Sequence, residues 1–208
     1  MTLDTIEQVM DLAPVIPVLT IERVSDAVPL ARALVRGGLR ALEVTLRTDA
    51  ALAAISAIAR DVPDSVPGVG TVMTPDDLVQ ARAAGARFAV SPGFAPDLVT
   101  AAGDLPYLPG IATPSEAMAA QMAGLRHVKF FPAEAMGGVK TLAALAGPFP
   151  SLIFCPTGGI GRAQAGDYLA LGNVRCVGGS WVAPRDLVRG EDWDAICELA
   201  SAAAKLGR

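Results

Sequence analysis

The sequence predicts an α/β fold: a closed (β/α)₈ barrel, or TIM barrel, preceded by an extra N-terminal helix, in a single domain over residues 1–208. Short apolar runs alternate with Ala-rich amphipathic segments at a period of about 20 to 27 residues, which favours parallel strands joined by helices. Eight such runs are present, and eight strands close a barrel. The 52% hydrophobic content of this length is sufficient for one sizeable core.

Each expected element follows from a local signal. The eight apolar runs predict strands over residues 15–20, 41–46, 66–71, 87–91, 107–111, 127–131, 152–155 and 174–178, and a helix is expected over residues 3–12. Thr74 and Thr113 each precede a proline and stand three residues before an acidic residue, which is the pattern of a capped helix start. Glycines at 37, 85, 124 and 172 are expected to end helices in the left-handed conformation.

An open doubly wound sheet is the alternative architecture. It is disfavoured because Gly68 and Gly70 are not followed by the third glycine of a dinucleotide-binding turn.

Composition excludes several classes of function. The net charge is −4 and no cluster of Lys or Arg could follow a phosphate backbone, so we expect no nucleic-acid partner. No apolar run approaches the roughly 18 residues of a membrane span, so we expect no membrane association. Asp4 and Glu7 occupy the place of the basic and apolar regions of a secretory signal, which predicts a cytoplasmic protein.

Metal and disulfide sites are not expected either. Cys155, Cys176 and Cys197 are an odd number and are far apart in the sequence, which fits neither a disulfide framework nor a zinc site. His127 is the only histidine, so a site with two His ligands is excluded. We interpret His127 as a packing residue near the barrel floor.

Two charged residues share one slot of the repeat. Aligning four units on the glycines at 38, 85, 124 and 172 brings Glu43, Val90, Lys129 and Val177 into register. Alternate strands of a barrel contribute one layer of inward side chains. We therefore expect Glu43 and Lys129 to face the same interior, while their apolar neighbours in sequence face the helices.

Lys129 lies between Val128 and Phe130, where an isolated charge is costly unless it is paired, deprotonated or next to a wet pocket. The chain has only three lysines among its 17 basic residues. A neutral amine can add to a ketone, whereas a guanidinium cannot. We interpret Lys129 as a nucleophile and Glu43 as a general acid and base, with a purely structural ion pair between them as the alternative.

Arg47 and two glycine clusters complete the predicted site. Arg47 lies two residues beyond Thr45, toward the C-terminal mouth of the barrel, where a guanidinium suits a substrate carboxylate; a surface arginine at a helix start is the alternative. The clusters at residues 158–159 and 178–179 follow the seventh and eighth strands, where barrels commonly hold a phosphate. Plain tight turns are the alternative for these glycines.

Six segments together resemble the 2-keto-3-deoxy-6-phosphogluconate (KDPG) aldolase family, which also includes 4-hydroxy-2-oxoglutarate (KHG) aldolases. They are LEVTLRT at 42–48, GVGTV at 68–72, SPG at 91–93, KFFPAE at 129–134, CPTGGI at 155–160 and GGSW at 178–181, and the likeness spans residues 14–181. Val69 and Met136 depart from the family pattern, which leaves the preference for the aldehyde open.

The resemblance implies a class I aldolase, a lyase without metal or cofactor. It would cleave 2-dehydro-3-deoxy-6-phosphogluconate to pyruvate and glyceraldehyde 3-phosphate through a lysine Schiff base, as in the Entner-Doudoroff pathway. Cleavage of 4-hydroxy-2-oxoglutarate to pyruvate and glyoxylate is an additional activity open to it. The implied partners are a small keto acid and a phosphorylated aldehyde, and the implied assembly is a homotrimer.

Carried over residue by residue, the family pattern assigns roles that agree with the repeat. Lys129 would form the Schiff base and Glu43 would be the proton shuttle. The other roles are carboxylate binding by Arg47 and Thr71, pocket walls at Pro92 and Phe131, contact with the hydroxylated part of the substrate by Thr157, and phosphate binding by Gly158, Gly159, Gly179 and Ser180.

Three other functions are compatible with the residues themselves. One is a sugar-phosphate isomerase or epimerase, with Glu43 as the carbon base and Lys129 acting only through its charge. The second is a binding module that senses phosphorylated sugar acids without turnover. The third is a metal-dependent aldolase, which would lose activity in a chelator.

Overall fold

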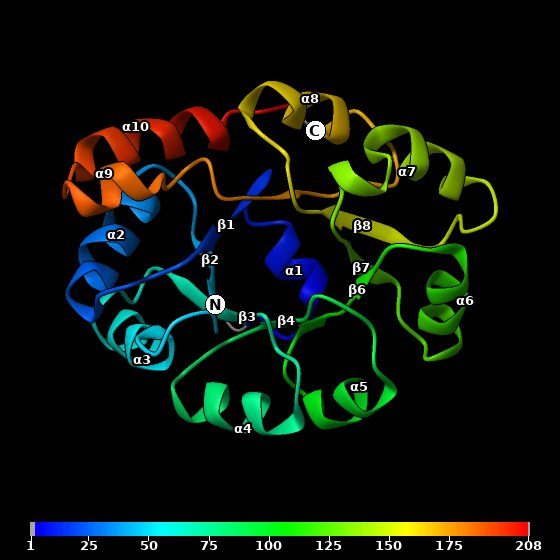
Figure 1. Ribbon diagram of the computed structural model, residues 1–208, viewed down its shortest axis with the longest axis horizontal. Coiled ribbons are helices and arrows are strands. Elements are labelled where there is room, and N and C mark those ends of the chain that lie inside the picture. Colours follow the sequence, from blue (N-terminus) through cyan, green and yellow to red (C-terminus); the bar gives the residue numbers. More distant parts are fainter. Residues whose placement is uncertain (1–2, 208) are drawn as a thin grey trace.

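The computed structural model describes residues 3–207 as an α/β fold in which parallel strands form the inner layer and helices lie outside them (Figure 1). The strands are β1 (Val15–Leu19), β2 (Ala41–Thr45), β3 (Val66–Gly70), β4 (Ala89–Val90), β5 (Tyr107–Leu108), β6 (Gly110–Ile111), β7 (His127–Phe130), β8 (Ile153–Pro156) and β9 (Val177–Gly179). Every described pair of strands is parallel, as the alternating pattern predicts.

The strands form two curved sheets. One has the order β5-β4-β3-β2-β1-β9 and the other the order β6-β7-β8. Pro109 is the single residue between β5 and β6, and isolated parallel bridges join Phe154 to Val174 and Thr157 to Gly178. The two sheets therefore meet along the chain on one side and through these bridges on the other.

The helices connect successive strands and surround them in Figure 1. They are α1 (Ile6–Met10), α2 (Val24–Arg36), α3 (Ala51–Asp61), α4 (Pro75–Ala83), α5 (Pro96–Ala102), α6 (Pro114–Met122), the 3₁₀ helix η1 (Glu134–Met136), α7 (Gly138–Ala146), α8 (Arg162–Leu169), α9 (Arg185–Arg189) and α10 (Trp193–Ala204). Thr74 and Thr113 form the predicted capping boxes with Asp77 and Glu116. The expected N-terminal helix is present, shortened to Ile6–Met10.

Two hydrophobic clusters confirm the predicted alternation of strand residues. Leu42 and Val128 belong to the cluster between strands and helices. Ala41 and Cys155 belong to the inner cluster, which also contains Met10 of α1. In Figure 1 α1 lies at the centre of the ring of strands, so it fills one end of the interior. His127 lies at the start of β7, where burial lowers its pKa and Glu7 of α1 acts in the opposite direction.

The glycine predictions are confirmed at two positions and wrong at two. Gly85 and Gly124 have φ values of 92° and 79°. Gly37 is right-handed, and Gly38 takes the left-handed position with φ 96°. A Cβ on Gly37 would lie 2.4 Å from Ala200 Cβ, so this glycine serves the packing of α10 against α2. Gly172 is not left-handed, because α8 already ends at Leu169.

Several predicted strands are too long or displaced. The predicted strand 107–111 is divided at Pro109, which lacks the N–H that a ladder requires. The last regular strand is 177–179 rather than 174–178. Val177 belongs to the outer cluster and Cys176 to the inner one, so Val177 does not share the layer of Glu43. A shift of one residue moves a strand side chain to the opposite face of the sheet. The glycine alignment is therefore wrong by one residue for this last strand.

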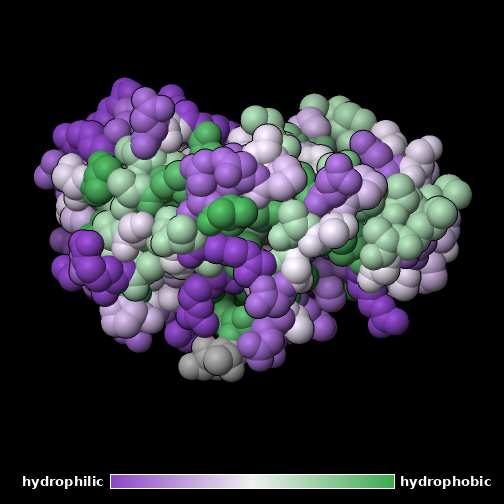
Figure 2. Space-filling model, turned by 90° about the horizontal axis from the view of Figure 1, so that it is seen from below, coloured by the Kyte–Doolittle hydropathy of each residue, from purple (hydrophilic) through white to green (hydrophobic). Residues whose placement is uncertain are grey.

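The outer surface carries several exposed apolar side chains on two helical segments. Met73 lies two residues before α4 and Val79 lies within it, and Met118 and Met122 lie on α6; these four side chains are 58% to 87% exposed. Figure 2 shows apolar surface gathered on the right, the side where Figure 1 places α6. Over the described residues, no helix has the length and hydropathy needed to cross a membrane.

Candidate active site

A buried ion pair lies inside the ring of strands. β7 carries Lys129 and β2 carries Glu43, and the distance from Lys129 Nζ to Glu43 Oε1 is 3.0 Å. Their side chains are only 6% and 4% exposed. Lys129 and Glu43, which the repeat predicts to face the same interior, are therefore in direct contact, although they are 86 residues apart in sequence. Such a pair holds a transferable proton between an amine and a carboxylate that are both buried.

The walls around the pair are made by small and aromatic groups. A Cβ on Gly70, at the end of β3, would lie 2.4 Å from Glu43 Oε1, so the carboxylate occupies the space that a side chain would need. On the other side the Phe131 ring centroid lies 5.3 Å from Lys129 Nζ, within the range of a cation–π contact. Gly70 therefore shapes the pocket. The sequence shows this glycine only as part of an incomplete dinucleotide-binding motif and of a family segment, so this role could not be predicted from it.

Gly70→Ala is expected to lower kcat for the predicted aldol cleavage by about 10²-fold, because a displacement of about 1 Å in a reacting group, here the Glu43 carboxylate, has an effect of this size. The added methyl group would push the Glu43 carboxylate away from Lys129. Gly166→Ala in α8 is the matched control, because nothing lies within 4 Å of that position. Steady-state kinetics of both variants test this; an unchanged kcat in Gly70→Ala would contradict a catalytic position for the carboxylate.

Two other predicted site residues follow β3 and β4. Thr71 has φ 65°, a left-handed conformation that is rare for a β-branched residue and is typical of functional sites. Pro92 lies against β6, because its carbonyl oxygen would be 2.3 Å from a Cβ on Gly110. Gly110 is the register partner of Lys129. Pro92 therefore lies against Gly110, the residue of β6 that pairs with Lys129.

The glycine loop after β8 is held by the segment after β7. Gly158 and Gly159 are left-handed, with φ values of 105° and 80°. The Glu134 N–H donates to the Gly158 carbonyl at 3.0 Å, and a Cβ on Gly158 would lie 3.2 Å from the Phe131 ring. Thr157 is bridged to Gly178 of β9. The first glycine cluster therefore lies in the loop after β8, beside the second one. Gly178 and Gly179 belong to β9 itself, so the prediction that this cluster follows its strand is wrong.

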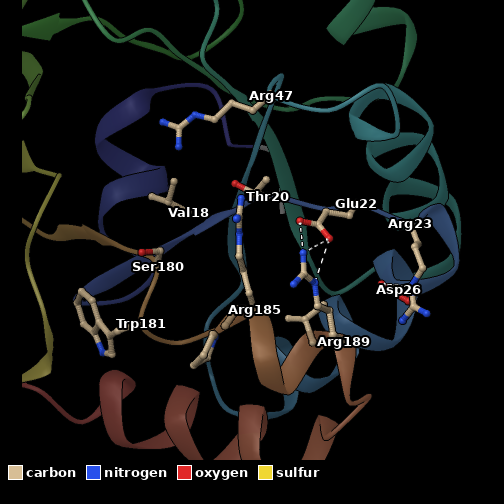
Figure 3. Close-up of a pocket in the computed structure, with 13 residues that line it drawn as sticks. Val18, Thr20, Glu22, Arg23, Asp26, Arg47, Ser180, Trp181, Arg185 and Arg189 are labelled. Atoms are coloured by element: carbon tan, nitrogen blue, oxygen red, sulfur yellow. Dashed lines mark hydrogen bonds and ion pairs between the residues drawn. The ribbon is translucent and has the colours of Figure 1, made fainter.

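A cavity of about 570 Å³ opens beside β1, between the ends of β2 and β9 and helix α9 (Figure 3). Among the predicted site residues, Arg47 and Ser180 line it. Val18, also in its wall, is the register partner of Glu43, and Thr20 Oγ1 lies 3.3 Å from Thr45 Oγ1, two residues beyond Glu43. The cavity thus borders the strand segment that carries the acidic residue. Arg185 and Trp181 also line the cavity, and neither is a predicted site residue.

A model of the family described as KDPG and KHG aldolase matches residues 6–199. The chain belongs to the KDPG and KHG aldolase family. Its relatives in this aldolase family include the 2-dehydro-3-deoxy-phosphogluconate aldolase of Pseudoalteromonas atlantica, 54% identical over 95% of this chain and 93% of that protein. They also include the KHG/KDPG aldolase of Escherichia coli, 51% identical over 96% of this chain and 94% of that protein.

Solved structures of KDPG aldolases share the fold. The crystal structure of KDPG aldolase from Legionella pneumophila, with pyruvate captured as a covalent carbinolamine intermediate, superimposes with a TM-score of 0.94. The two proteins are 45% identical, over 97% of this chain and 98% of that one. Within residues 3–207 of this aldolase family member, no three His, Cys, Asp or Glu side chains form a group suited to a metal ion, and none of the three cysteines forms a disulfide.

Proposed function

We propose that this chain is a class I aldolase, a lyase that cleaves 2-dehydro-3-deoxy-6-phosphogluconate to pyruvate and glyceraldehyde 3-phosphate. The observation that carries the proposal is the buried contact of 3.0 Å between the Lys129 amine and the Glu43 carboxylate. The high identity to aldolases of this name supports the same substrate.

The ion pair supplies the nucleophile. Transfer of one proton from Lys129 to Glu43 within their hydrogen bond leaves a neutral amine facing a neutral carboxylic acid. The amine lone pair then attacks C2 of the keto acid. Glu43 gives its proton to the ketone oxygen and takes one from the attacking nitrogen, which leaves a neutral carbinolamine. Loss of that oxygen as water, with its second proton coming from Glu43, produces the iminium.

The iminium is the electron sink for cleavage. When the C3–C4 bond breaks, its electron pair moves into the C2–N bond and forms an enamine, while the C4 hydroxyl proton passes to the Glu43 carboxylate. The aldehyde leaves with C4 as its carbonyl carbon. Glu43 then gives this proton to C3 of the enamine, and hydrolysis of the resulting iminium by water releases pyruvate and restores Lys129.

The remaining residues bind the substrate in this proposal. Arg47 and Thr71 hold the pyruvyl carboxylate, and Pro92 and Phe131 wall the reacting carbons. Thr157 contacts the hydroxylated part, and the phosphate lies against Gly158, Gly159, Gly179 and Ser180. Supporting this arrangement, Arg47 and Ser180 line one cavity and Phe131 packs at the lysine.

The same proposal includes the architecture and setting. The two sheets close as one eight-stranded (β/α)₈ barrel, and the bridges to Val174 and Gly178 support this closure. The barrel is a single domain, 1–208, of which residues 1, 2 and 208 lie outside the described residues.

The exposed apolar residues of α4 and α6 support burial in an assembly, for which we propose a homotrimer. We place the enzyme in the cytoplasm and its reaction in the Entner-Doudoroff pathway.

Cleavage of 4-hydroxy-2-oxoglutarate to pyruvate and glyoxylate is a second candidate activity. The Escherichia coli relative at 51% identity bears both substrate names. This substrate has the same keto acid end, so it would use the same lysine and acid.

Reductive trapping tests the proposed function. Incubation with pyruvate and borohydride is expected to add one reduced pyruvyl group to Lys129, located by peptide mass spectrometry. Lys140, an exposed residue of α7, and Lys205 are internal controls and should stay unmodified. Absence of an adduct would contradict the Schiff-base mechanism and favour the isomerase alternative.

A further inference from the structure

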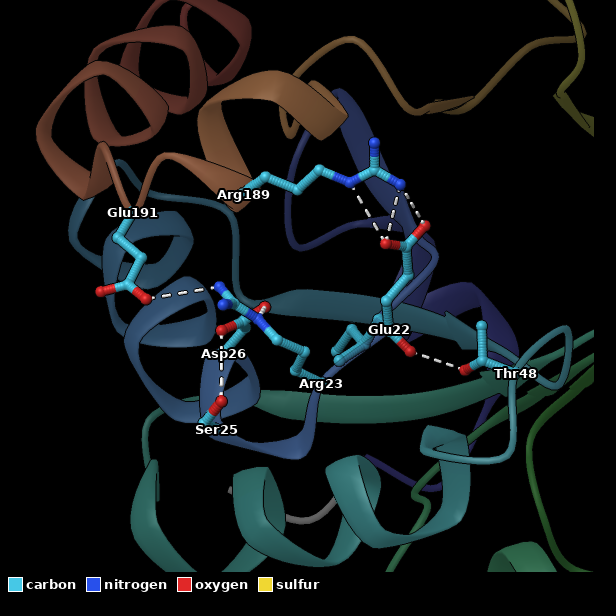
Figure 4. A network of polar contacts seen from close by, with 8 residues as sticks. Glu22, Arg23, Ser25, Asp26, Thr48, Arg189 and Glu191 are labelled. Carbon is cyan, nitrogen blue, oxygen red and sulfur yellow. Dashed lines mark hydrogen bonds and ion pairs between the residues drawn. The ribbon is translucent and has the colours of Figure 1, made fainter.

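The cavity beside β1 is lined by four arginines, and two of them are neutralised within the protein. Arg23 Nε lies 2.9 Å from Asp26, and its Nη2 lies 3.3 Å from Glu191. Arg189 makes a forked contact with Glu22, at 3.0 and 3.1 Å (Figure 4). The two acidic residues in the cavity wall, Glu22 and Asp26, are therefore both engaged.

The side chains of the other two arginines, Arg47 and Arg185, form no ion pair or hydrogen bond with any residue in the described range 3–207. Both lie in the cavity wall and are exposed to it. Two uncompensated positive charges thus face one concave space. A concave cationic site of this kind attracts an anionic ligand.

The two free guanidinium groups come from different parts of the cavity. In Figure 3 Arg185 extends from the first residue of α9 across the cavity toward Thr20, at the end of β1, with Ser180 beside it. Arg47 extends from the far end of the cavity, beyond β2. A ligand reaching from one to the other would need an anionic group near each end.

We propose that Arg185 determines specificity by binding the terminal phosphate of the phosphorylated substrate, across the cavity from Arg47. This inference rests on the proposed function, in which Arg47 holds the carboxylate of the same molecule. A guanidinium can donate two parallel N–H groups to a dianionic phosphate, and the Ser180 hydroxyl is available on the adjacent wall.

The Glu22–Arg189 pair keeps Arg185 available for this contact. Both Glu22 carboxylate oxygens accept hydrogen bonds from Arg189, one turn of α9 beyond Arg185. Without Arg189, the Glu22 carboxylate would be an uncompensated anion in the wall of the same cavity as Arg185. The pair therefore holds a competing carboxylate away from the free guanidinium.

The test compares a phosphorylated and an unphosphorylated substrate in Arg185→Ala. The ratio of kcat/KM for 2-dehydro-3-deoxy-6-phosphogluconate to that for 4-hydroxy-2-oxoglutarate is expected to fall by about 10- to 100-fold, the loss expected for a hydrogen-bonded charged group. The loss should appear in KM for the phosphorylated substrate rather than in kcat. Competitive inhibition by inorganic phosphate should weaken in parallel. Arg185→Lys should recover part of both effects, because it restores the charge without the fork.

The double variant Glu22→Gln/Arg189→Gln is the matched control. It removes a positive and a negative charge from the same cavity wall together, so the selectivity ratio should stay within about twofold. An unchanged ratio and unchanged phosphate inhibition in Arg185→Ala would overturn the role of Arg185. Pyruvate trapping on the unaltered protein separates the two proposals. If the adduct forms but selectivity is unchanged in Arg185→Ala, only the role of Arg185 is contradicted. If no adduct forms, both the proposed function and this inference are contradicted.

Discussion

Lys129→Met is expected to abolish aldol cleavage, with kcat lower by at least about 10⁴-fold, because no other described amine lies at the buried carboxylate to form the Schiff base. Methionine keeps much of the length and apolar stem of lysine but has no nucleophilic nitrogen. Coupled detection of pyruvate release measures the loss. Turnover above this limit would place the nucleophile elsewhere, with Lys140 and Lys205 the remaining lysines.

The same change is expected to destabilise the fold by about 3–5 kcal/mol, since it leaves the Glu43 carboxylate buried without its partner. The double variant Lys129→Met/Glu43→Gln removes both charges and should recover much of this stability while staying inactive. Urea denaturation of the single and double variants measures the difference. A stable but inactive double variant shows that the lost activity does not come from unfolding.

Glu43→Gln is expected to lower kcat by about 10²- to 10⁴-fold with a smaller effect on KM, the range for loss of a general acid and base. The amide keeps the size of the carboxyl group but cannot accept the C4 hydroxyl proton. Because the amine remains, pyruvate and borohydride should still modify Lys129, but more slowly, since Glu43 no longer moves the protons of Schiff-base formation. Adduct formation without efficient cleavage would separate the roles of the two residues.

A kcat within about threefold of the unaltered protein would instead show that Glu43 only neutralises Lys129. This outcome would favour the purely structural ion pair that the sequence leaves open. Glu43→Asp is a useful companion variant, because it keeps the acid but withdraws it by one methylene from the 3.0 Å contact. Partial activity in Glu43→Asp and loss in Glu43→Gln would indicate proton transfer.

Some features of the site can be predicted from local sequence patterns, and others cannot. The inward direction and the contact of Lys129 and Glu43 could be predicted because strand alternation and the glycine repeat are local, periodic signals. Gly70 was missed because its requirement comes from the carboxylate of a neighbouring strand. Arg185 was missed because its freedom depends on which acid pairs with which arginine, and Glu22 and Arg189 are 167 residues apart.

The sequence by itself determined the order of strands and helices, the capped starts of α4 and α6, and the inward direction of the two central charges. These follow from propensities and periodicities within a few residues. Only the tertiary structure decided where β9 begins, why Gly37 is a glycine and which arginines remain uncompensated. Each of these depends on contacts between distant segments, such as α2 against α10, and such contacts exist only once the chain has folded.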